Sequence, residues 1–377
     1  MRVTLREAVR LVKRARVRSA VRTLAVALVI GSSTAALPDE PPVPAPPAPE
    51  VPGAPLLARD TPLGELVYAP GRGLRVGDTG LHLGGYGNLN LLRPEGGPAR
   101  FGMDDLSLFV TWEPVARVQL FSELEVEDLF EVYDTGAGGT HEADFTAERL
   151  YADVAGTDWL NLRVGKFLTP VGRWNLIHAQ PLTWTSSRPL ATELPFDPHT
   201  TGAMVFGAVY PTHGTLAYTL YGQAVNQFEA VTVPQPQQRS GGARLEYIDR
   251  LDWSVGASYL AAENHGIWRQ LGGVDGLWRA DRVEVMGEAT VEQGDAPTLD
   301  QWGLYLQGVV ETWPRVFLVG RYEHYAWQTG PRDVNMFVAG VAYKPMPWLV
   351  LKTEYLAADH RAEQEPPGYR ASIAVLF

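Results

Sequence analysis

The sequence contains no cysteine, four lysines and, after residue 36, no apolar run long enough to form a transmembrane helix. The absence of cysteine excludes disulfide scaffolds, thiol catalysis, cysteine-based metal sites and a lipid anchor on an N-terminal cysteine. The formal net charge of −11 argues against a nucleic-acid partner. No Gly-x-Ser-x-Gly elbow, Walker loop or His-Glu-x-x-His motif is present, so we expect no enzyme, no catalytic residue, no cofactor and no metal.

The N-terminal region is typical of an exported protein. Residues 2–22 contain eight basic side chains and one acidic one, and an apolar stretch and a group of small residues follow. This order predicts a signal peptide over residues 1–36, cleaved near Ala35 or Ala36, and its removal changes the formal charge from −11 to −18. Residues 38–55 contain nine prolines, which predict a disordered periplasmic segment over 37–62 or a tether toward the cell wall.

Short segments with period-two alternation of apolar and polar residues occupy the remainder, residues 63–377. Leu120, Leu124 and Val126, for example, alternate with the polar residues Glu123 and Glu125. The predicted strands lie near 81–92, 103–113, 116–127, 145–155, 159–168, 201–210, 214–226, 240–248, 252–262, 270–279, 282–293, 300–312, 315–328, 334–344, 347–357 and 369–377.

The connections between these strands alternate between short and long. The short ones follow the even-numbered strands, whereas most of the others are longer, especially 128–144, 168–200, 227–239 and 358–368. A bacterial outer-membrane barrel has this arrangement, with short periplasmic turns and longer extracellular loops. Because an unpaired strand edge is costly in lipid, we predict an all-β, antiparallel, up-and-down transmembrane barrel of about 16 strands, with 14 or 18 left open.

Aromatic residues lie at the strand ends next to every short connection. Such rings favour the headgroup region of a membrane, where an apolar body and a polar tip are both accommodated. They predict an aromatic girdle at the periplasmic interface. Its members are Trp112, Trp159, Tyr210, Trp253, Trp278, Trp313 and Trp348.

Two stretches resemble known outer-membrane proteins. Residues 369–377 end in Phe377, with Tyr369, Ile373 and Val375 on the same face, and resemble the C-terminal strand that the barrel assembly machinery recognises. The pattern Gly-x-Phe-x-x-Pro over 165–170, preceded by residues 148–154, resembles porins related to the phosphate-selective porin O/P group. The resemblance implies a sixteen-stranded general or anion-favouring porin that forms a homotrimer. The four lysines depart from the lysine clusters of phosphate-selective members and argue against phosphate selectivity.

The longest predicted loop, 169–200, is the candidate constriction of the pore. Five prolines stiffen it, and loops of this length are uncommon unless they are functional or disordered. The alternatives are an extracellular cap and a latch onto a neighbouring subunit. Its candidate selectivity residues are Arg173, His178, Arg188, Glu193, Asp197 and His199.

Charged residues on the polar face of the strands are candidates for the lumen wall, where rings of charge set ion preference. They could instead pair with one another as structural salt bridges. These residues are Arg117, Glu123, Glu125, Arg149, Arg163, Arg244, Arg279, Glu284, Glu288, Arg321, Glu323, Lys352 and Glu354.

Together these features predict a passive, water-filled channel in the bacterial outer membrane for ions and small polar solutes. Its predicted partners are outer-membrane lipids, small solutes or ions, the assembly machinery and two further copies of the chain. One alternative is a non-conducting barrel that acts as an adhesin or cell-wall anchor through the Pro-rich segment. A barrel-embedded hydrolase is the other alternative.

Overall fold

The computed structural model describes residues 56–135, 138–139, 144–177, 179–223, 225, 237–249, 252–295, 300–327, 333–361 and 364–377. The predicted signal peptide and all nine prolines of 38–55 lie outside the described residues.

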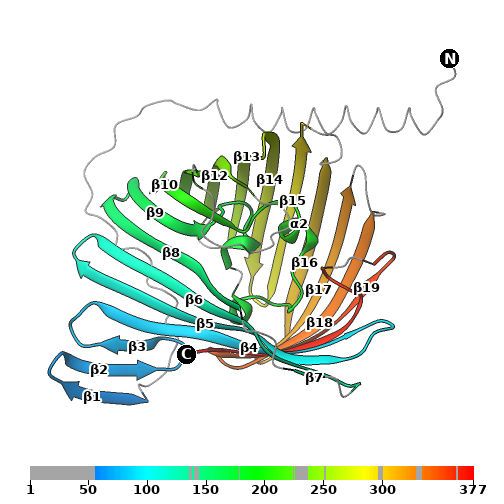
Figure 1. Ribbon diagram of the computed structural model, residues 1–377, viewed down its shortest axis with the longest axis horizontal. Coiled ribbons are helices and arrows are strands. Elements are labelled where there is room, and N and C mark those ends of the chain that lie inside the picture. The colour runs from blue at the N-terminus through cyan, green and yellow to red at the C-terminus, as the bar shows by residue number, and fades with distance from the viewer. Residues whose placement is uncertain are drawn as a thin grey trace.

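Sixteen strands within the described residues form an antiparallel barrel, as the alternation predicted (Figure 1). The barrel closes because the last strand pairs with the first, with Leu376 opposite Tyr86 and Gly368 opposite Pro94. Its strands are β4 (Leu81–Pro94), β5 (Arg100–Val115), β6 (Val118–Tyr133), β8 (Asp144–Thr157), β9 (Leu160–Leu168), β10 (His199–Val209), β11 (Thr215–Gln223), β12 (Arg239–Asp249), β13 (Trp253–Asn264), β14 (Ile267–Ala280), β15 (Val283–Gly294), β16 (Gln301–Trp313), β17 (Val316–Trp327), β18 (Val334–Met346), β19 (Leu349–Ala358) and β20 (Gly368–Leu376).

The apolar phase of the alternation faces outward. Large apolar side chains such as Leu150, Leu306 and Phe337 are exposed on the outer surface, whereas the intervening charged residues are buried inside. This arrangement is expected when the surrounding medium is hydrocarbon and the enclosed space is polar. The prediction that the polar face of each strand lines the barrel interior is therefore confirmed.

Several of the short connections contain two residues, such as 116–117, 281–282 and 314–315. Arg117, Asp281 and Arg315 adopt positive φ angles of 71°, 44° and 68°, which lets these tight turns match the twist of the strands. On the other end of the barrel, the connection between β9 and β10 is the longest in the described chain. The β13–β14 connection at that end is short, because His265 and Gly266 both adopt positive φ angles and close a two-residue turn.

Three short strands that the alternation did not predict precede the barrel: β1 (Leu57–Thr61), β2 (Gly64–Ala69) and β3 (Gly73–Val76). They form a meander, and β3 pairs with the first residues of β4, from Leu81 to Leu83. Figure 1 shows them in blue, projecting beyond the ring of barrel strands. β1 lies within the range 37–62 that was assigned to a disordered segment. A further short strand, β7 (Gly138–Gly139), pairs with β6.

The buried apolar side chains lie inside the barrel rather than between two sheets. The β9–β10 loop contains the 3₁₀ helices η1 (Trp174–Ile177) and η2 (Gln180–Leu182) and the short helix α2 (Leu190–Glu193). Its apolar residues pack against the inner wall in several clusters. Among the described residues, no helix is long and apolar enough to cross a membrane.

Candidate functional site

The β9–β10 loop folds into the barrel, where the strands surround it (Figure 1). Its two ends are tied together at the wall. The Thr169 hydroxyl donates to the Asp197 carbonyl at 2.8 Å, and Asn175 Nδ2 donates to the carbonyls of Thr169 and Pro198 at 2.9 and 3.0 Å. These hydrogen bonds form the neck of the loop, which consists of Thr169, Asn175, Asp197 and Pro198 and fixes the direction in which the loop leaves the wall.

Two cations on the far wall hold the middle of the loop. Arg321 on β17 binds Glu323 through Nε at 2.7 Å, and its terminal nitrogens donate to the Thr185 hydroxyl and the Ser187 carbonyl and hydroxyl at 2.6, 3.0 and 2.7 Å. Lys352 Nζ donates to four oxygens of residues 180–185 at 2.6 to 3.1 Å. Arginine suits such a site because its planar fork presents several donors in fixed directions.

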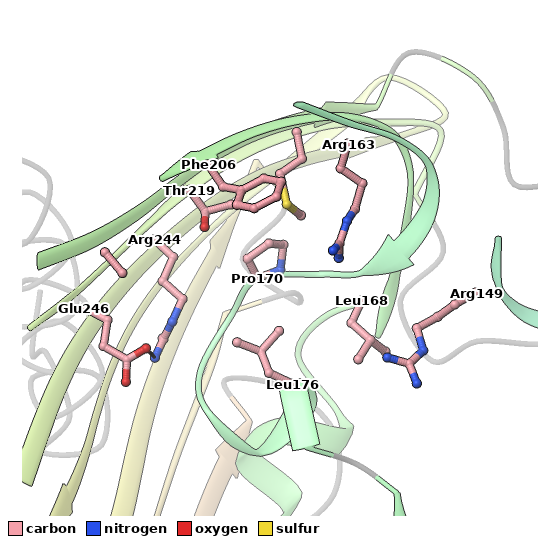
Figure 2. A pocket seen from close by; sticks show the side chains of 11 residues that line it. Arg149, Arg163, Leu168, Pro170, Leu176, Phe206, Thr219, Arg244 and Glu246 are labelled. Atoms are coloured by element: carbon pink, nitrogen blue, oxygen red, sulfur yellow. Dashed lines mark ion pairs between the residues drawn. The ribbon is translucent and has the colours of Figure 1, made fainter. Parts of the chain in front are cut away.

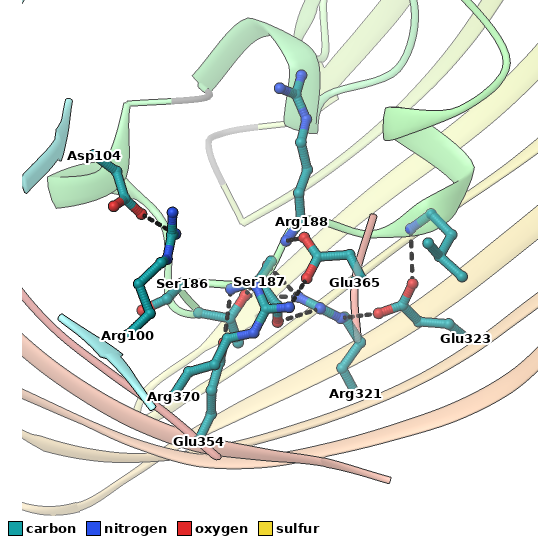
Figure 3. Close-up of polar contacts among 12 residues, drawn as sticks. Arg100, Asp104, Ser186, Ser187, Arg188, Arg321, Glu323, Glu354, Glu365 and Arg370 are labelled. Atoms are coloured by element: carbon teal, nitrogen blue, oxygen red, sulfur yellow. Dashed lines mark hydrogen bonds and ion pairs between the residues drawn. The ribbon is translucent and has the colours of Figure 1, made fainter. Parts of the chain in front are cut away.

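Carboxylates on the same wall and in the β19–β20 connection accept the loop's backbone N–H groups. Figure 3 shows Glu323, Glu354 and Glu365 turned toward the segment around Ser187 and Arg188. Leu190 N, Ser187 N and Arg188 N donate to these carboxylates at 2.8, 2.6 and 2.8 Å, in that order. Glu288 likewise accepts Trp174 N at 2.6 Å. Buried N–H groups outside regular structure need such acceptors, because an unpaired donor is costly.

Glu365 lies in the β19–β20 connection, and its other oxygen is 2.5 Å from Arg370 Nη2. Burial raises the pKa of the Glu365 carboxyl from 4.5 to about 7, whereas the Arg370 charge and the Arg188 N–H oppose the rise. The contact between the inward loop and this outer connection therefore contains a group that titrates near neutral pH.

Apolar contacts complete the attachment. Leu190 and Leu194 pack against Tyr325, Met336 and Leu356 on the inner wall. The Trp174 ring meets the Tyr305 ring edge-on at 6.0 Å. Trp184 contacts Phe317 at 4.7 Å, and Lys344 lies 3.8 Å above the Trp184 ring. The loop therefore covers the inner faces of β15–β20, where apolar residues lie among the charged ones that bind it.

The candidate selectivity residues of the loop that the structure describes do not form one cluster, and each makes its own polar contacts. Arg173 binds Glu246 and Ser254 on the wall, and Arg188 binds Asn175 at 2.7 Å and Glu193 at 3.1 Å.

Two predicted loop residues lie near the neck. Asp197 Oδ1 accepts the His199 N–H at 3.0 Å. The imidazole of His199, which begins β10, contacts Glu148. His178 lies outside the described residues.

The predicted wall charges fall into two groups. Those on β15–β19 are covered by the loop and attach it: Glu284, Glu288, Arg321, Glu323, Lys352 and Glu354. Arg279 at the strand end pairs with Glu284.

The wall charges on the opposite side of the barrel form pairs within the wall. Arg149 binds Glu123, Arg163 binds Asp153 at 2.7 Å, and Arg244 binds Asp275 at 2.5 Å. Glu125 on β6 accepts the hydroxyls of Tyr86 and Ser107. Arg117 lies in the turn between β5 and β6 rather than on a strand, because its positive φ angle closes that turn.

A cavity of about 280 Å³ remains between this wall and the loop. Figure 2 shows the guanidinium groups of Arg149, Arg163 and Arg244 arranged around Pro170 and Leu176 of the loop. A second cavity, of about 430 Å³, lies between the β5–β6 turn and residues of β8–β10, and Arg117 lines it. Phe206 lines both cavities.

Aromatic residues on this wall were not among the predicted site residues. Phe109, Phe121 and Tyr151 occupy the inward phase of their strands, between polar residues of the same phase, and Phe206 follows the buried Met204 in the inward phase of β10. The signal was available, since an aromatic residue in the polar phase of an alternating strand faces the interior of a barrel.

One group of carboxylates within the described residues could hold a cation. Oxygens of Glu125, Glu127 and Glu148 lie within 4.8 Å of one another. Oxygen ligands suit calcium or magnesium, but Glu125 already accepts two hydroxyls and Glu148 contacts His199.

The predicted girdle residues lie at the strand ends next to the short turns. Trp112, Trp159, Tyr210, Trp253, Trp278 and Trp313 are exposed, whereas Trp348 is half-buried. The backbone of Gly71 in the β2–β3 turn packs against Trp348, since a Cβ at Gly71 would come 2.8 Å from the Trp348 Cβ.

The predicted assembly-signal residues lie on β20 and at the end of the chain. Tyr369 and Ile373 are exposed on the outer face, and Val375 and Phe377 are half-buried. Phe377 extends the closure of the barrel, because its backbone exchanges two hydrogen bonds of 2.9 Å with Gly85.

Comparisons with known proteins agree with the fold. No protein-family model matches the sequence. An uncharacterized protein of Aquifex aeolicus (strain VF5) is 25% identical over 358 residues, which cover 79% of this chain and 80% of that protein. Three solved structures of low sequence identity share the architecture.

The first is OmpTdeltaL8, a loop-deletion mutant of an outer-membrane protein of Vibrio cholerae, with a TM-score of 0.55, 13% identity and coverage of 79% of this chain and 99% of that chain. Salmonella typhi OmpF in complex with daunomycin has a TM-score of 0.58 and 10% identity, and the match covers 79% of this chain and 97% of that chain. An anion-selective porin from Comamonas acidovorans has a TM-score of 0.52 and 13% identity, and the match covers 78% of this chain and 98% of that chain.

Proposed function

We propose that the chain is an outer-membrane porin, a passive channel for ions and small polar solutes. The observation that carries the proposal is the attachment of the β9–β10 loop inside a closed sixteen-strand barrel. A barrel of this size leaves room for water, and the loop occupies one side of that room. The cavity between the loop and the Arg149–Arg163–Arg244 wall is the narrow part of the proposed path.

Selectivity in this proposal comes from residues of the loop (169–200) and from the wall opposite it. Charges at a narrowing determine ion preference most strongly because the local dielectric constant is low. Of the predicted loop residues, we assign this role to Arg173 and Arg188, which lie among carboxylates. The wall charges on β15–β19 position the loop and do not line the path.

A distant relationship to the phosphate-selective porin O/P group is part of the proposal. The Gly-x-Phe-x-x-Pro pattern has a structural role that supports it. Gly165 has a φ of 135°, and a Cβ there would come 2.7 Å from the Tyr151 Cα. Phe167 is fully buried beneath the loop, and Pro170 directs the chain inward. Phosphate selectivity is not included, because lysines are few.

The remaining expectations complete the proposal. The chain is exported by a signal peptide over 1–36, and the segment 37–62 lies in the periplasm. The exposed apolar outer surface contacts outer-membrane lipids, and the predicted aromatic girdle lies at the periplasmic interface. The assembly machinery recognises the C-terminal strand, and three copies form a homotrimer.

Planar-bilayer recording of the purified protein tests the channel. We expect discrete single-channel steps in KCl, and a silent bilayer would favour the non-conducting adhesin or anchor.

Reversal potentials in a KCl gradient then test whether the β9–β10 loop sets the ion preference. Arg188→Ala should shift the preference toward cations because it removes a positive charge from the loop. Arg282→Ala, which removes an exposed charge from a turn at the opposite end, is the matched control. An unchanged preference in Arg188→Ala would remove the loop from the proposed filter.

A further inference from the structure

Five aromatic rings follow one another across the inner wall of neighbouring strands, and we call them the aromatic track. The track consists of Tyr86, Phe109, Phe121, Tyr151 and Phe206. The ring centroids of Tyr86 and Phe109 are 5.7 Å apart, those of Phe109 and Phe121 are 5.9 Å apart, and those of Phe121 and Tyr151 are 5.1 Å apart. Arg163 lies between Tyr151 and Phe206, at 3.7 and 5.5 Å from their centroids. The five rings and Arg163 therefore form a continuous surface from β4 to β10.

The track is partly open to the interior. Phe109, Phe121, Tyr151 and Phe206 are half-buried, whereas Tyr86 is buried. The rings face the side of the barrel that the loop leaves uncovered, unlike Trp174 and Trp184, which the loop buries against the other wall. Apolar surface left in water is unfavourable, and small inorganic ions gain nothing from it. A row of such rings therefore points to a solute with apolar surface of its own.

Two guanidinium groups lie directly on the track. Arg149 lies 4.8 Å from the Phe121 centroid and 5.7 Å from that of Phe109. Within the described residues, the ion pair of Arg149 with Glu123 uses Nε, so its two terminal nitrogens stay available as donors. Arg163 binds Asp153 through Nε and Nη2, at 2.7 and 2.8 Å, which leaves Nη1. These donors suit an anionic oxygen above the rings.

Two cavities touch the track, and they share one of its rings. The cavity of about 430 Å³ at the barrel rim and the cavity of about 280 Å³ beside the loop both include Phe206. The inner cavity also includes Arg149 and Arg163. Both spaces are comparable in size to sites for small organic molecules. A solute can therefore contact the track on its way past the loop.

We propose that the aromatic track binds organic carboxylates with a flat apolar body, such as aromatic acids. The apolar body stacks on Phe109, Phe121 or Phe206, and the carboxylate accepts hydrogen bonds from Arg149 and Arg163. The inference rests on the proposed channel function and names a solute class for it. Saccharides are the competing class, because their apolar ring faces also stack on aromatic side chains, but they carry no negative charge to pair with the guanidinium groups of Arg149 and Arg163.

Block of the KCl current tests this assignment. Potassium benzoate, added to a conducting bilayer, should reduce the single-channel current in a saturable way. Potassium acetate, which has the charge without the ring, and maltose, which has rings without the charge, should do so only at concentrations at least about 10-fold higher. Equal block by benzoate and acetate, or stronger block by maltose, would overturn the proposal while leaving the channel intact. Absence of KCl steps would overturn the channel itself.

Variants locate the binding place. Phe121→Leu keeps apolar volume but removes a ring, and should weaken benzoate block about 2- to 10-fold. Arg149→Lys keeps a positive charge beside Glu123 but loses the planar guanidinium, and should weaken the block as well. Phe337→Leu removes a ring from the outer face, where Phe337 is 61% exposed, and should leave the block unchanged. Benzoate block that persists unaltered in both inner-wall variants would contradict the proposed site.

Discussion

Arg321 illustrates how single residues define the interior of this barrel. Its guanidinium binds one carboxylate on its own strand and three oxygens of the inward loop, and the residue is 3% exposed. A charge in such a place is stable because four of the five guanidinium N–H donors are paired and the charge of Glu323 is opposite. The same residue, considered from the sequence, was a candidate for the solvent-filled lumen.

Arg321→Ala should lower the free energy of unfolding by about 3–5 kcal/mol, because it leaves the buried carboxylate of Glu323 without its cation. Urea unfolding in detergent micelles, followed by tryptophan fluorescence, measures the change. Arg282→Ala, at an exposed turn, should change stability by less than about 0.5 kcal/mol. A similar, small effect of both substitutions would contradict the structural role of Arg321.

Glu365 gives the protein a pH dependence near neutrality. Since burial raises its pKa from 4.5 to about 7, the folded protein binds more protons than the unfolded chain within this window. The free energy of unfolding should therefore fall as pH rises from about 4.5 to about 7, by about 3 kcal/mol. Glu365→Gln cannot titrate and should flatten the curve when unfolding is measured at several pH values. An identical slope in wild type and variant would show that another group causes it.

At the scale of the element, the inward loop behaves as a packed part of the structure rather than as a free connection. Wall residues from β15 to β20 reach it through side-chain hydrogen bonds, and its own apolar residues fill clusters on the inner wall. Five prolines reduce the conformational entropy that the loop loses on docking.

Lys352→Met should loosen the loop, because four oxygens of residues 180–185 lose a buried donor. Trypsin cleaves after Arg173 only when the loop leaves the wall, so cleavage at this site should accelerate at least about 10-fold, whereas the Arg188–Pro189 bond resists trypsin. Peptide mass mapping of the folded protein in detergent reports the cut sites. Leu351→Met, on the outer face of the same strand, is the control and should leave the rate unchanged.

The elements differ in how well the sequence predicts them. All sixteen barrel strands were predicted, because alternation is a local property that bilayer and lumen impose on every strand. Their ends agree within three residues except at β6, which continues to Tyr133, six residues into the predicted loop 128–144. The contact of Lys352 with Gln180 joins residues 172 positions apart, and no local pattern encodes it. Strands β1–β3 were missed because they are four to six residues long and lie among glycines and prolines.

At the scale of the whole molecule, the barrel and the β1–β3 meander are joined along one strand. β20 pairs with β4 from Tyr86 onward, and β3 pairs with β4 only at Leu81–Leu83. Closure of the ring therefore does not depend on the meander. The two units share β4 but use different stretches of its edge.

A chain that begins at residue 78 should thus still refold into a conducting barrel. We expect KCl conductance equal to that of the protein with the meander, but a lower melting temperature because three residues of β4 lose their partners. Circular dichroism on heating and bilayer recording measure the two properties. Loss of conductance in the shortened chain would show that the meander shapes the pore.

The inward loop leaves the sheet after β9, yet the residues that hold it come mostly from strands near the C-terminus. In a chain that has formed only its first strands, the N–H groups of the loop still need solvent molecules as acceptors. The concave side of such an intermediate stays hydrated until the C-terminal strands arrive. Ring closure and expulsion of that water are therefore one late event, so the half-assembled sheet does not contain a dry interior.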